Sequence, residues 1–491
     1  MSKHAAGPTR RRKRCGQLLS TLVLCAALIL VTAVSTGWAL SALKPPLAAG
    51  PAPDLPADTP PVEPAPAPEP PQPVVTKVQF SASGDNLIHA PIYKQAARRA
   101  SPEEGYRFDE CYQYLTPLYQ QQDVNWINQE TLCTRELEPS SYPCFSTPGQ
   151  CPEALYRAGM RVFSLANNHT YDKGAGGIGA TLRFWESMPS DVITTGLWRG
   201  EDDYANIPLH TVNDIRIAYL SYTEHTNGIP QNDKMPAHIL YTSQLDQIQQ
   251  QIEAAAQIAD FVVVGVHWGV ENSHTITQAQ QTLAQQLADW GADLILGTHP
   301  HVLQDAQWLT AADGRTAFVA YSLGNLISTQ SKPDQLIGAI LTIQLEKTVQ
   351  PNGAVELALH SPLLHPIVTH YDAGKSNVRS YLYSDYTAEL AKQHGVRAEH
   401  NVFDFEYIRS VAEKTIQPEF LSLSRKVEIT RRYSKIFCKA ELLYAFLKAE
   451  MECRYVRSIQ NPCGTKPHDD QRAGCQVQEQ QPGRLSSNFC R

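Results

Sequence analysis

Short apolar runs alternate with amphipathic stretches between residues 75 and 360, and this alternation predicts an α/β layered fold. Runs rich in β-branched residues and bounded by turn-forming residues are typical of strands. Stretches with an apolar residue at every third or fourth position are typical of helices that cover a sheet. Residues 261–266 are apolar apart from one glycine, so we expect that strand to be buried on both faces. The predicted strands are 75–81, 124–127, 162–165, 215–220, 261–266, 293–296, 318–321, 339–344 and 355–359, and the predicted helices are 153–159, 179–187, 243–259 and 277–290.

The N-terminal region has a different pattern, in which a basic segment precedes an uncharged apolar stretch. Residues 1–14 carry six basic residues and no acidic one, and residues 16–43 carry no charge. A helix needs about 20 residues to cross a bilayer, whereas the apolar part of a signal peptide has about 7–15. The stretch therefore predicts a single-pass anchor in the cell membrane, with residues 1–15 cytoplasmic and the rest extracytoplasmic. A long signal peptide cut near residues 39–42 is the alternative, and either way we expect the folded body to be exported.

Composition divides the rest of the chain. Thirteen of the residues between 45 and 73 are proline, which favours an extended stalk. Residues 386–449 contain helical patches, and five of the 11 cysteines lie beyond residue 437. The predicted organisation is a cytoplasmic basic tail (1–15), a transmembrane signal anchor (16–43), a Pro-rich stalk (44–74), an α/β domain (75–370) and a helical, Cys-rich C-terminal extension (371–491).

The cysteines and the net charge bear on the disulfide content of the protein and on the class of its partners. Four cysteines lie in the predicted domain, at Cys111, Cys133, Cys144 and Cys151. Disulfides are the default for exported cysteines, and the nine cysteines beyond the anchor leave one over. The net charge is −7, and it becomes −13 beyond residue 14, which argues against nucleic acid as a partner.

Polar residues follow directly after five of the predicted strands. The carboxyl ends of strands in α/β sheets are where ligand sites gather, so we expect these side chains to meet at one rim. Each motif alone also fits a turn, a helix cap or an aromatic cluster, but their combination and order favour a site. The motifs are Gly84-Asp85, Asn128-Gln129-Glu130, Asn167-Asn168-His169, His267-Trp268-Gly269 and Gly297-Thr298-His299-Pro300-His301.

These residue types predict a metal site. Imidazole, carboxylate and amide groups are ligands of divalent transition metals such as Zn, Fe or Mn. Two ions about 3.5–4 Å apart, bridged by one carboxylate, would activate water and clamp a phosphoryl group. His169 would then be a catalytic acid outside the ligand set, able to protonate a leaving oxygen. The predicted ligands are Asp85, Glu130, Asn168, His267, His299 and His301.

Seven segments in order resemble the CapA family of capsule and poly-γ-glutamate synthesis proteins. They are GDNLIHAPIY (84–93), NQET (128–131), SYPCFSTP (141–148), SLANNHTYDKG (164–174), VHWGVEN (266–272), DLILGTHPHVLQ (293–304) and YSLGNLIS (321–328). The resemblance implies a calcineurin-like metallophosphatase fold, a four-layer sandwich with two mixed sheets flanked by helices. It also implies the same six ligands, with His169 in the place of the catalytic histidine.

The chain departs from that superfamily's motifs at two points. The usual Asp-x-His is replaced by Asp85-Asn86-Leu87, and the usual Gly-Asp-x-x-Asp is replaced by Asn-Gln-Glu. Glu130 must then act as the bridging carboxylate, and His89 is one candidate for the missing ligand. Five further residues are candidates for supporting or substrate-facing roles, with helix caps and tight turns as alternatives; they are Asn128, Asp172, Glu271, Ser322 and Asn325.

Three functions compete at this point. The first is an exported, membrane-tethered, metal-dependent hydrolase that acts on a phosphoester or a surface polymer. The second is a non-catalytic accessory subunit, which binds or guides an anionic polymer beside poly-γ-glutamate synthesis and export proteins. The third is a structural surface module without metals.

Overall fold

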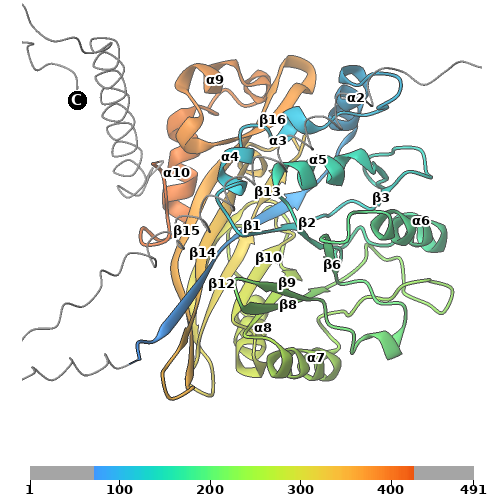
Figure 1. Ribbon diagram of the computed structural model, residues 1–491. Coiled ribbons are helices and arrows are strands. Elements are labelled where there is room, and N and C mark those ends of the chain that lie inside the picture. The colour runs from blue at the N-terminus through green and yellow to red at the C-terminus, as the bar shows by residue number, and fades with distance from the viewer. Residues whose placement is uncertain (1–70, 425–491) are drawn as a thin grey trace, which may run out of the picture. The chain divides into compact units, whose positions relative to one another are not determined.

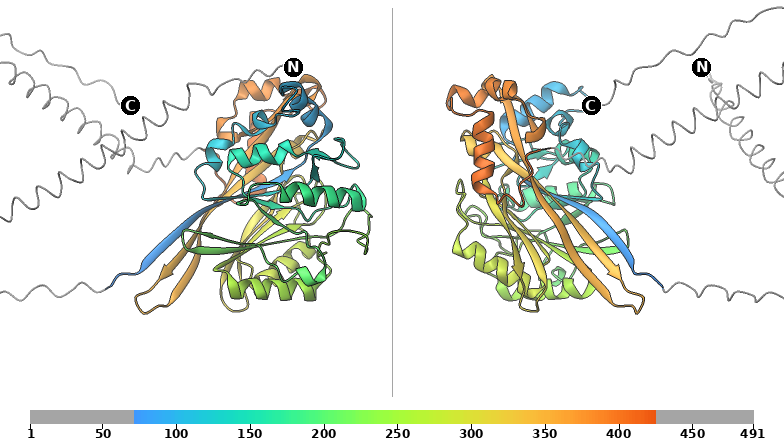
Figure 2. Two further views of the ribbon diagram at one scale, coloured as in Figure 1. Left: turned by 45° about the vertical axis from the view of Figure 1, so that its right-hand side comes forward. Right: turned by 90° about the vertical axis from the view of Figure 1, so that its left-hand side faces the viewer.

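The computed structural model describes residues 71–424, which form two mixed β-sheets with helices on their outer sides (Figures 1 and 2). The predicted cytoplasmic tail, the anchor, nearly all of the stalk and the part of the extension beyond Ser424 lie outside the described residues. Within 71–424, no helix has the length and apolar character needed to cross a bilayer.

The first sheet has eight strands. Its order is β16-β15-β14-β1-β2-β5-β6, and the short β13 pairs with β1. The pairs from β1 through β6 are parallel, as is β1 with β13, while β1, β14, β15 and β16 are antiparallel. The strands are β1 (Val74–Asn86), β2 (Val124–Asn128), β5 (Val162–Ser164), β6 (Ile193–Thr195), β13 (Asn325–Ile327), β14 (Ile337–Val349), β15 (Val355–Asp372) and β16 (Ser376–Leu382).

The second sheet has six strands in the order β11-β12-β10-β9-β8-β7. Its inner strands are parallel, and an antiparallel strand closes each edge. The strands are β7 (Leu209–Val212), β8 (Ile215–Thr223), β9 (Phe261–His267), β10 (Leu294–Thr298), β11 (Leu303–Thr310) and β12 (Thr316–Leu323), and a separate pair joins β3 (Cys133–Thr134) to β4 (Thr147–Pro148).

The helices cover the outer faces of the two sheets (Figure 1). Helix α8 begins with a capping box, in which the Thr277 hydroxyl accepts from the Gln280 backbone and the Gln280 side chain accepts in return. The α-helices are α2 (Ala90–Arg99), α3 (Asp109–Tyr112), α4 (Thr116–Tyr119), α5 (Gln150–Ala158), α6 (Gly174–Glu186), α7 (Leu245–Ile258), α8 (Gln278–Trp290), α9 (Ala388–Gln393) and α10 (Phe405–Thr415).

Alternation along β9 shows how the layers pack. Val263 belongs to the core between the sheets, whereas Val262 and Val264 pack in a second core with the buried faces of α7 and α8. The expectation that residues 261–266 are buried on both faces is therefore confirmed. Burying each of these valines contributes about 1.5–3 kcal/mol, so this strand anchors both layers.

The chain returns from the second sheet to the first through a single residue, whereas its earlier crossing, from β6 to β7, takes residues 196–208. Strand β12 of the second sheet ends at Leu323, and β13 of the first sheet begins at Asn325. Gly324 between them has φ +62°, and its carbonyl accepts a hydrogen bond of 2.9 Å from the amide of Asp85. A β-carbon on Gly84 would lie 1.8 Å from that carbonyl oxygen, so both glycines are required where the sheets meet.

All nine predicted strands and all four predicted helices have counterparts in the structure. The fold continues beyond the boundary expected at residue 370, which lies inside β15. Strand β16 then extends the first sheet, because it pairs antiparallel with the end of β15, from Ile367 opposite Leu382 to Asp372 opposite Ser376. Residues 371–424 are thus part of the same body, with α9 and α10 as its helical component.

The four cysteines of the described region are free thiols rather than disulfides. Cys111, Cys133 and Cys151 are fully buried and pack as small apolar side chains. Burial raises the pKa of Cys151 to about 11, so this thiol is held in its neutral form. The tail cysteines lie outside the described residues.

Candidate metal centre

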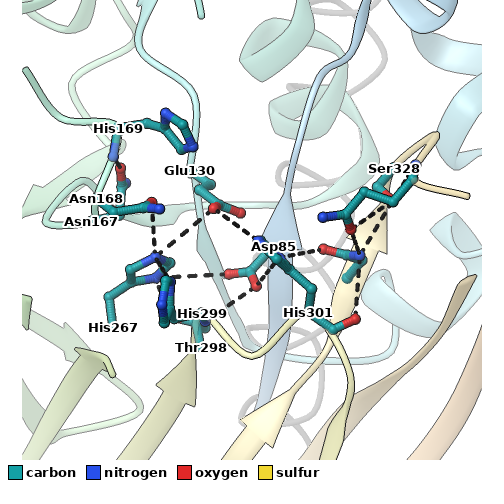
Figure 3. A network of polar contacts seen from close by, with 12 residues as sticks. Asp85, Glu130, Asn167, Asn168, His169, His267, Thr298, His299, His301 and Ser328 are labelled. Atoms are coloured by element: carbon teal, nitrogen blue, oxygen red, sulfur yellow. Dashed lines mark hydrogen bonds and ion pairs between the residues drawn. The ribbon is translucent and has the colours of Figure 1, made fainter. Parts of the chain in front are cut away.

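The predicted ligands come from both sheets and meet between them (Figure 3). The first sheet supplies Asp85 at the end of β1, Glu130 after β2 and Asn168 after β5. The second sheet supplies His267 at the end of β9 and the His299–His301 segment after β10. All six side chains are buried. The expectation that strand ends bring these residues to one place agrees with the geometry.

One group consists of Asp85, Glu130 and His301. A ligand atom from each lies within 4.8 Å of the others, and this is the one such group of three His, Cys, Asp or Glu side chains within residues 71–424. The Nδ1 atom of His301 lies 3.2 Å from Asp85 Oδ2, and its Nε2 atom lies 3.6 Å from Glu130 Oε1.

A second group forms around His267. Its Nε2 atom lies 3.1 Å from Asn168 Oδ1 and 3.1 Å from Nδ1 of His299. Glu130 Oε1 lies 3.9 Å from the same nitrogen. This carboxylate oxygen therefore lies between the two groups.

The donor set fits divalent cations. Ligand atoms about 2.0–2.2 Å from one ion lie about 3 Å apart, which is close to the separations around His267 Nε2. Both oxygens of Glu130 are buried without a hydrogen-bond partner in the described structure, as is Oδ1 of Asn128. An unpaired buried carboxylate is costly, and a cation would satisfy it.

Electrostatics keep two of the imidazoles neutral. Burial, followed by repulsion from His299, holds the pKa of His267 well below its usual value. Burial and His301 lower the pKa of His299 to about 3. Neutral imidazole is the form that binds metal, so these rings need not lose a proton first.

The carboxylates have the opposite effect on their neighbour. Burial lowers the pKa of His301, but the charges of Glu130 and Asp85 outweigh it and raise the pKa to about 9. Burial also raises the pKa of Glu130. The surroundings of His301 therefore favour a positive charge beside the two carboxyl groups.

Backbone conformation aims the two histidines around Pro300. His299 has φ +98° and His301 has φ +59°, values that are uncommon for residues other than glycine. The His299 amide donates to Asp85 Oδ2 at 3.2 Å, which ties this strained turn to the first sheet. Such strain is typical of segments that a site requires in one geometry.

His169 lies beside the ligand groups and is held by a carboxylate. Its Nδ1 atom lies 2.8 Å from Asp172 Oδ2, and because a carboxylate only accepts, Nδ1 is the donor and Nε2 is left for other chemistry. The same Asp172 oxygen accepts from the Phe145 amide at 2.6 Å. The Phe145 ring packs edge-on against His169, so the imidazole is fixed on two sides.

The other predicted supporting residues have different positions. Asn128 donates to Asp85 Oδ1 at 2.8 Å, and Asn325 Oδ1 lies 3.1 Å from Nδ1 of His301. Ser322 instead accepts from the Gly324 amide and donates to the Val302 carbonyl, which is the tight-turn alternative.

Two candidates do not take the expected places. His89 precedes α2, accepts from the Thr329 amide and packs against Phe145, apart from the three-residue group. Burial and His301 lower its pKa to about 3. Glu271 is exposed, and the partners of His267 Nδ1 are the hydroxyl of Thr298 at 2.9 Å and the Asn128 amide at 3.4 Å. The spacing of residues along the chain does not identify Thr298 as a partner, because Thr298 ends β10, the strand that lies beside β9 in the sheet.

The loop after β8 also contributes residues that the sequence patterns did not single out. The ring of His225 lies 5.2 Å from that of His299, and the amide of Asn227 lies 3.4 Å from both Asn168 and His169. The signal available in the sequence was His-Thr-Asn-Gly at 225–228, five residues beyond the end of the strand predicted at 215–220.

Residues 79–330 match the family model described as bacterial capsule synthesis protein PGA_cap. A capsule biosynthesis protein CapA of Bacillus anthracis is 33% identical over 181 residues, which cover 36% of this chain and 42% of that protein. A PGA biosynthesis protein CapA of Bacillus subtilis (strain 168) is 28% identical over 243 residues, which cover 49% and 62%. The chain thus spans less than two thirds of each relative.

Solved structures give weaker likenesses. A putative 5'-nucleotidase from Staphylococcus aureus has a TM-score of 0.35 at 12% identity, covering 64% of this chain and 55% of that one. The calcineurin-like phosphoesterase YfkN from Bacillus subtilis also has a TM-score of 0.35 at 12% identity, covering 68% and 100%. Scores this low carry no information about the chemistry of the site.

Proposed function

The chain belongs to the PGA_cap family of bacterial capsule synthesis proteins, and from this premise we propose that it is a dinuclear metal-dependent hydrolase of the phosphoesterase type. The observation that carries the proposal is the position of Glu130. This carboxylate is buried, has no hydrogen-bond partner and lies between His267 and His301. A side chain in that state suits a bridge between two cations better than a structural role.

The buried side chains have two proposed roles, as metal ligands and as groups that orient the ligands. Asp85, Glu130 and His301 would hold one ion, and Glu130, Asn168, His267 and His299 would hold the other. Divalent cations supply Lewis acidity toward phosphoryl oxygens and a readily deprotonated water when they are bound. Thr298 and Asn325 orient the ligating rings through hydrogen bonds.

His169 is the proposed general acid. Asp172 accepts a hydrogen bond from Nδ1–H of His169, which fixes the tautomer and stabilises the ring when Nε2 is also protonated. The proton on Nε2 can then pass to the oxygen of the leaving group, and general acid catalysis of this kind contributes about 10²–10⁴-fold in rate.

The proposed setting is synthesis of a capsule polymer outside the cytoplasm. The B. subtilis relative is described as a PGA biosynthesis protein, which favours poly-γ-glutamate or another anionic polymer as the material handled. The apolar stretch 16–43 and the Pro-rich tract support a tethered, extracytoplasmic body near membrane-bound synthesis and export proteins.

The test uses the full chain, purified in detergent. We expect about two bound transition-metal ions per chain by plasma mass spectrometry, and Mn²⁺-dependent hydrolysis of a chromogenic phosphodiester. His299→Ala should lose metal and turnover, whereas His169→Ala should lose turnover and keep its metal. Turnover that persists in both variants, or that is insensitive to chelation, would contradict the proposal.

A non-catalytic accessory subunit is the second candidate. Leu87 stands where the superfamily's first motif has histidine, and its buried side chain offers no ligand atom. The group around Asp85 is therefore one ligand short. Stoichiometric metal without hydrolysis of any phosphoester, together with retention of poly-γ-glutamate by the metal-loaded protein, would favour this function.

A further inference from the structure

We propose that His225 and Asn227, on the loop after β8, form an oxyanion subsite that holds the phosphoryl group of the substrate against the metal centre. The inference deepens the proposed function and rests on it. The subsite would take a phosphate ester through side-chain hydrogen-bond donors.

The loop is anchored to the metal-bearing strand on both sides of β9's end. The Glu224 amide donates to the His267 carbonyl at 3.0 Å, and Glu224 Oε2 accepts from the Gly269 amide at 3.0 Å. Thr226 is held in turn by the Ile229 carbonyl and the Tyr241 hydroxyl. The residues between these anchors therefore have a fixed position relative to His267.

His225 is the solvent-facing neighbour of a buried ligand. It is exposed, while His299 beside it is buried, and the two rings meet edge-on at 84°. A ring placed between solvent and a ligand can contact a molecule that has entered the site. It is too far from the Asp85 group to belong to it.

Asn227 presents an amide with unused donors. Its φ of +50° is a left-handed conformation that asparagine tolerates, and the next residue, Gly228, also has positive φ. Asn227 Oδ1 accepts from Asn168 at 3.4 Å, which orients the amide group. Its Nδ2 lies 3.4 Å from Nδ1 of His169, but that nitrogen already donates to Asp172 and cannot accept.

The Nδ2 protons of Asn227 are thus directed toward the proposed general acid without an acceptor there. An oxygen of a phosphoryl group between His225 and His169 would supply one. Within residues 71–424 the ion-pair partners of Asp85 and Glu130 are histidines and not lysine or arginine, so donors on this loop would add to the cations in orienting an anion.

The test measures inorganic phosphate binding to the Zn²⁺-loaded full chain by calorimetry, beside phosphodiester turnover. Asn227→Asp keeps the oxygen that accepts from Asn168 and replaces the donor by a negative charge, while His225→Ala removes the ring. We expect the Kd for phosphate to rise about tenfold or more in each variant, KM to rise similarly, and metal content to stay constant. Asn213→Asp, at an exposed turn with φ +48°, and His360→Ala, on β15, are matched controls expected to bind like wild type.

Three outcomes would overturn the inference. Unchanged phosphate affinity in both variants, with metal and turnover intact, rejects the subsite and leaves the proposed function standing. Loss of metal from either variant shows that the loop supports the ligands instead. A wild-type chain that takes up no metal and hydrolyses no phosphoester removes the proposed function, and the subsite with it.

Discussion

Replacing Glu130 by glutamine tests two effects of this carboxylate: it should destabilise the metal-free fold, and it should stabilise the fold when metal is bound. The substitution keeps the side-chain shape and removes a charge that is buried without a hydrogen-bond partner. Burial raises the pKa of Glu130, so its ionisation opposes folding of the metal-free protein. This contribution favours stability at low pH and is lost as pH rises through the raised pKa. Metal-free Glu130→Gln should therefore be at least as stable as wild type at pH 8, while Asp85 still compensates His301.

With metal bound, wild type should be more stable than Glu130→Gln. A free-ion concentration of about 100 times Kd stabilises the folded state by about 2.7 kcal/mol. The 354 residues from 71 to 424 have an unfolding entropy of about 0.7 kcal/mol/K at about 2.1 cal/mol/K per residue. Wild-type Tm should then rise by about 4 °C, and the variant should keep only a small part of that shift.

Scanning calorimetry of the full chain, with Mn²⁺ and with chelator, measures both effects. Glu356→Gln, at an exposed position on β15, is the control and should show the wild-type shift. The reasoning is refuted if metal-free Glu130→Gln is clearly less stable than wild type. It is equally refuted if the variant retains the full metal-dependent rise.

Further predictions concern turnover, pH and packing. His169→Ala should lower kcat about 10²–10⁴-fold at unchanged metal content, measured in the phosphodiester assay. The hydrogen bond that His274 donates to Asp334 raises the pKa of His274, so this half-buried pair stabilises the fold below about pH 6.5 and the effect is lost as pH rises through the raised pKa. His274→Gln should cost about 0.2–1 kcal/mol in urea titrations at pH 5.5 and little at pH 8. Gly84→Ala should destabilise by about 1–3 kcal/mol or more, because its new carbon meets a backbone oxygen at 1.8 Å. Gly176→Ala, in α6 with open space around it, should instead stabilise by about 0.5–1 kcal/mol in the same denaturation assay.

The sequence contained most of the information about the central strands and the convergence of the donor residues. Residues 261–266 and 293–296 have patterns that only buried strands explain, and parallel strands must deliver their following residues to one edge. These shared edges group Glu130 with Asp85 in the first sheet and His267 with His299 in the second, whereas the meeting of the two groups depends on how the sheets pack (Figure 3).

Features set by tertiary contacts were harder to predict. Strand β16 is short and mixed in polarity, so its own sequence does not distinguish it from a loop. It is a strand because it pairs with β15, which is a tertiary contact. Thr298 contacts His267 because β10 lies beside β9 in the sheet. Glu271 is close to His267 in the sequence, but its side chain is exposed and the contact is made by Thr298. Asn227 depends on the left-handed turn that aims it, which Asn-Gly suggests but does not place.

The passage at Gly324 has a practical consequence for building chimeras. The strand that ends the second sheet and the strand that re-enters the first are joined through this one residue, whose carbonyl also accepts a hydrogen bond from the Asp85 amide. An exchange of either sheet with that of a relative must therefore carry β12, Gly324 and β13 as one cassette. A junction placed between them would misalign the two halves of the donor set, however well each half folded alone.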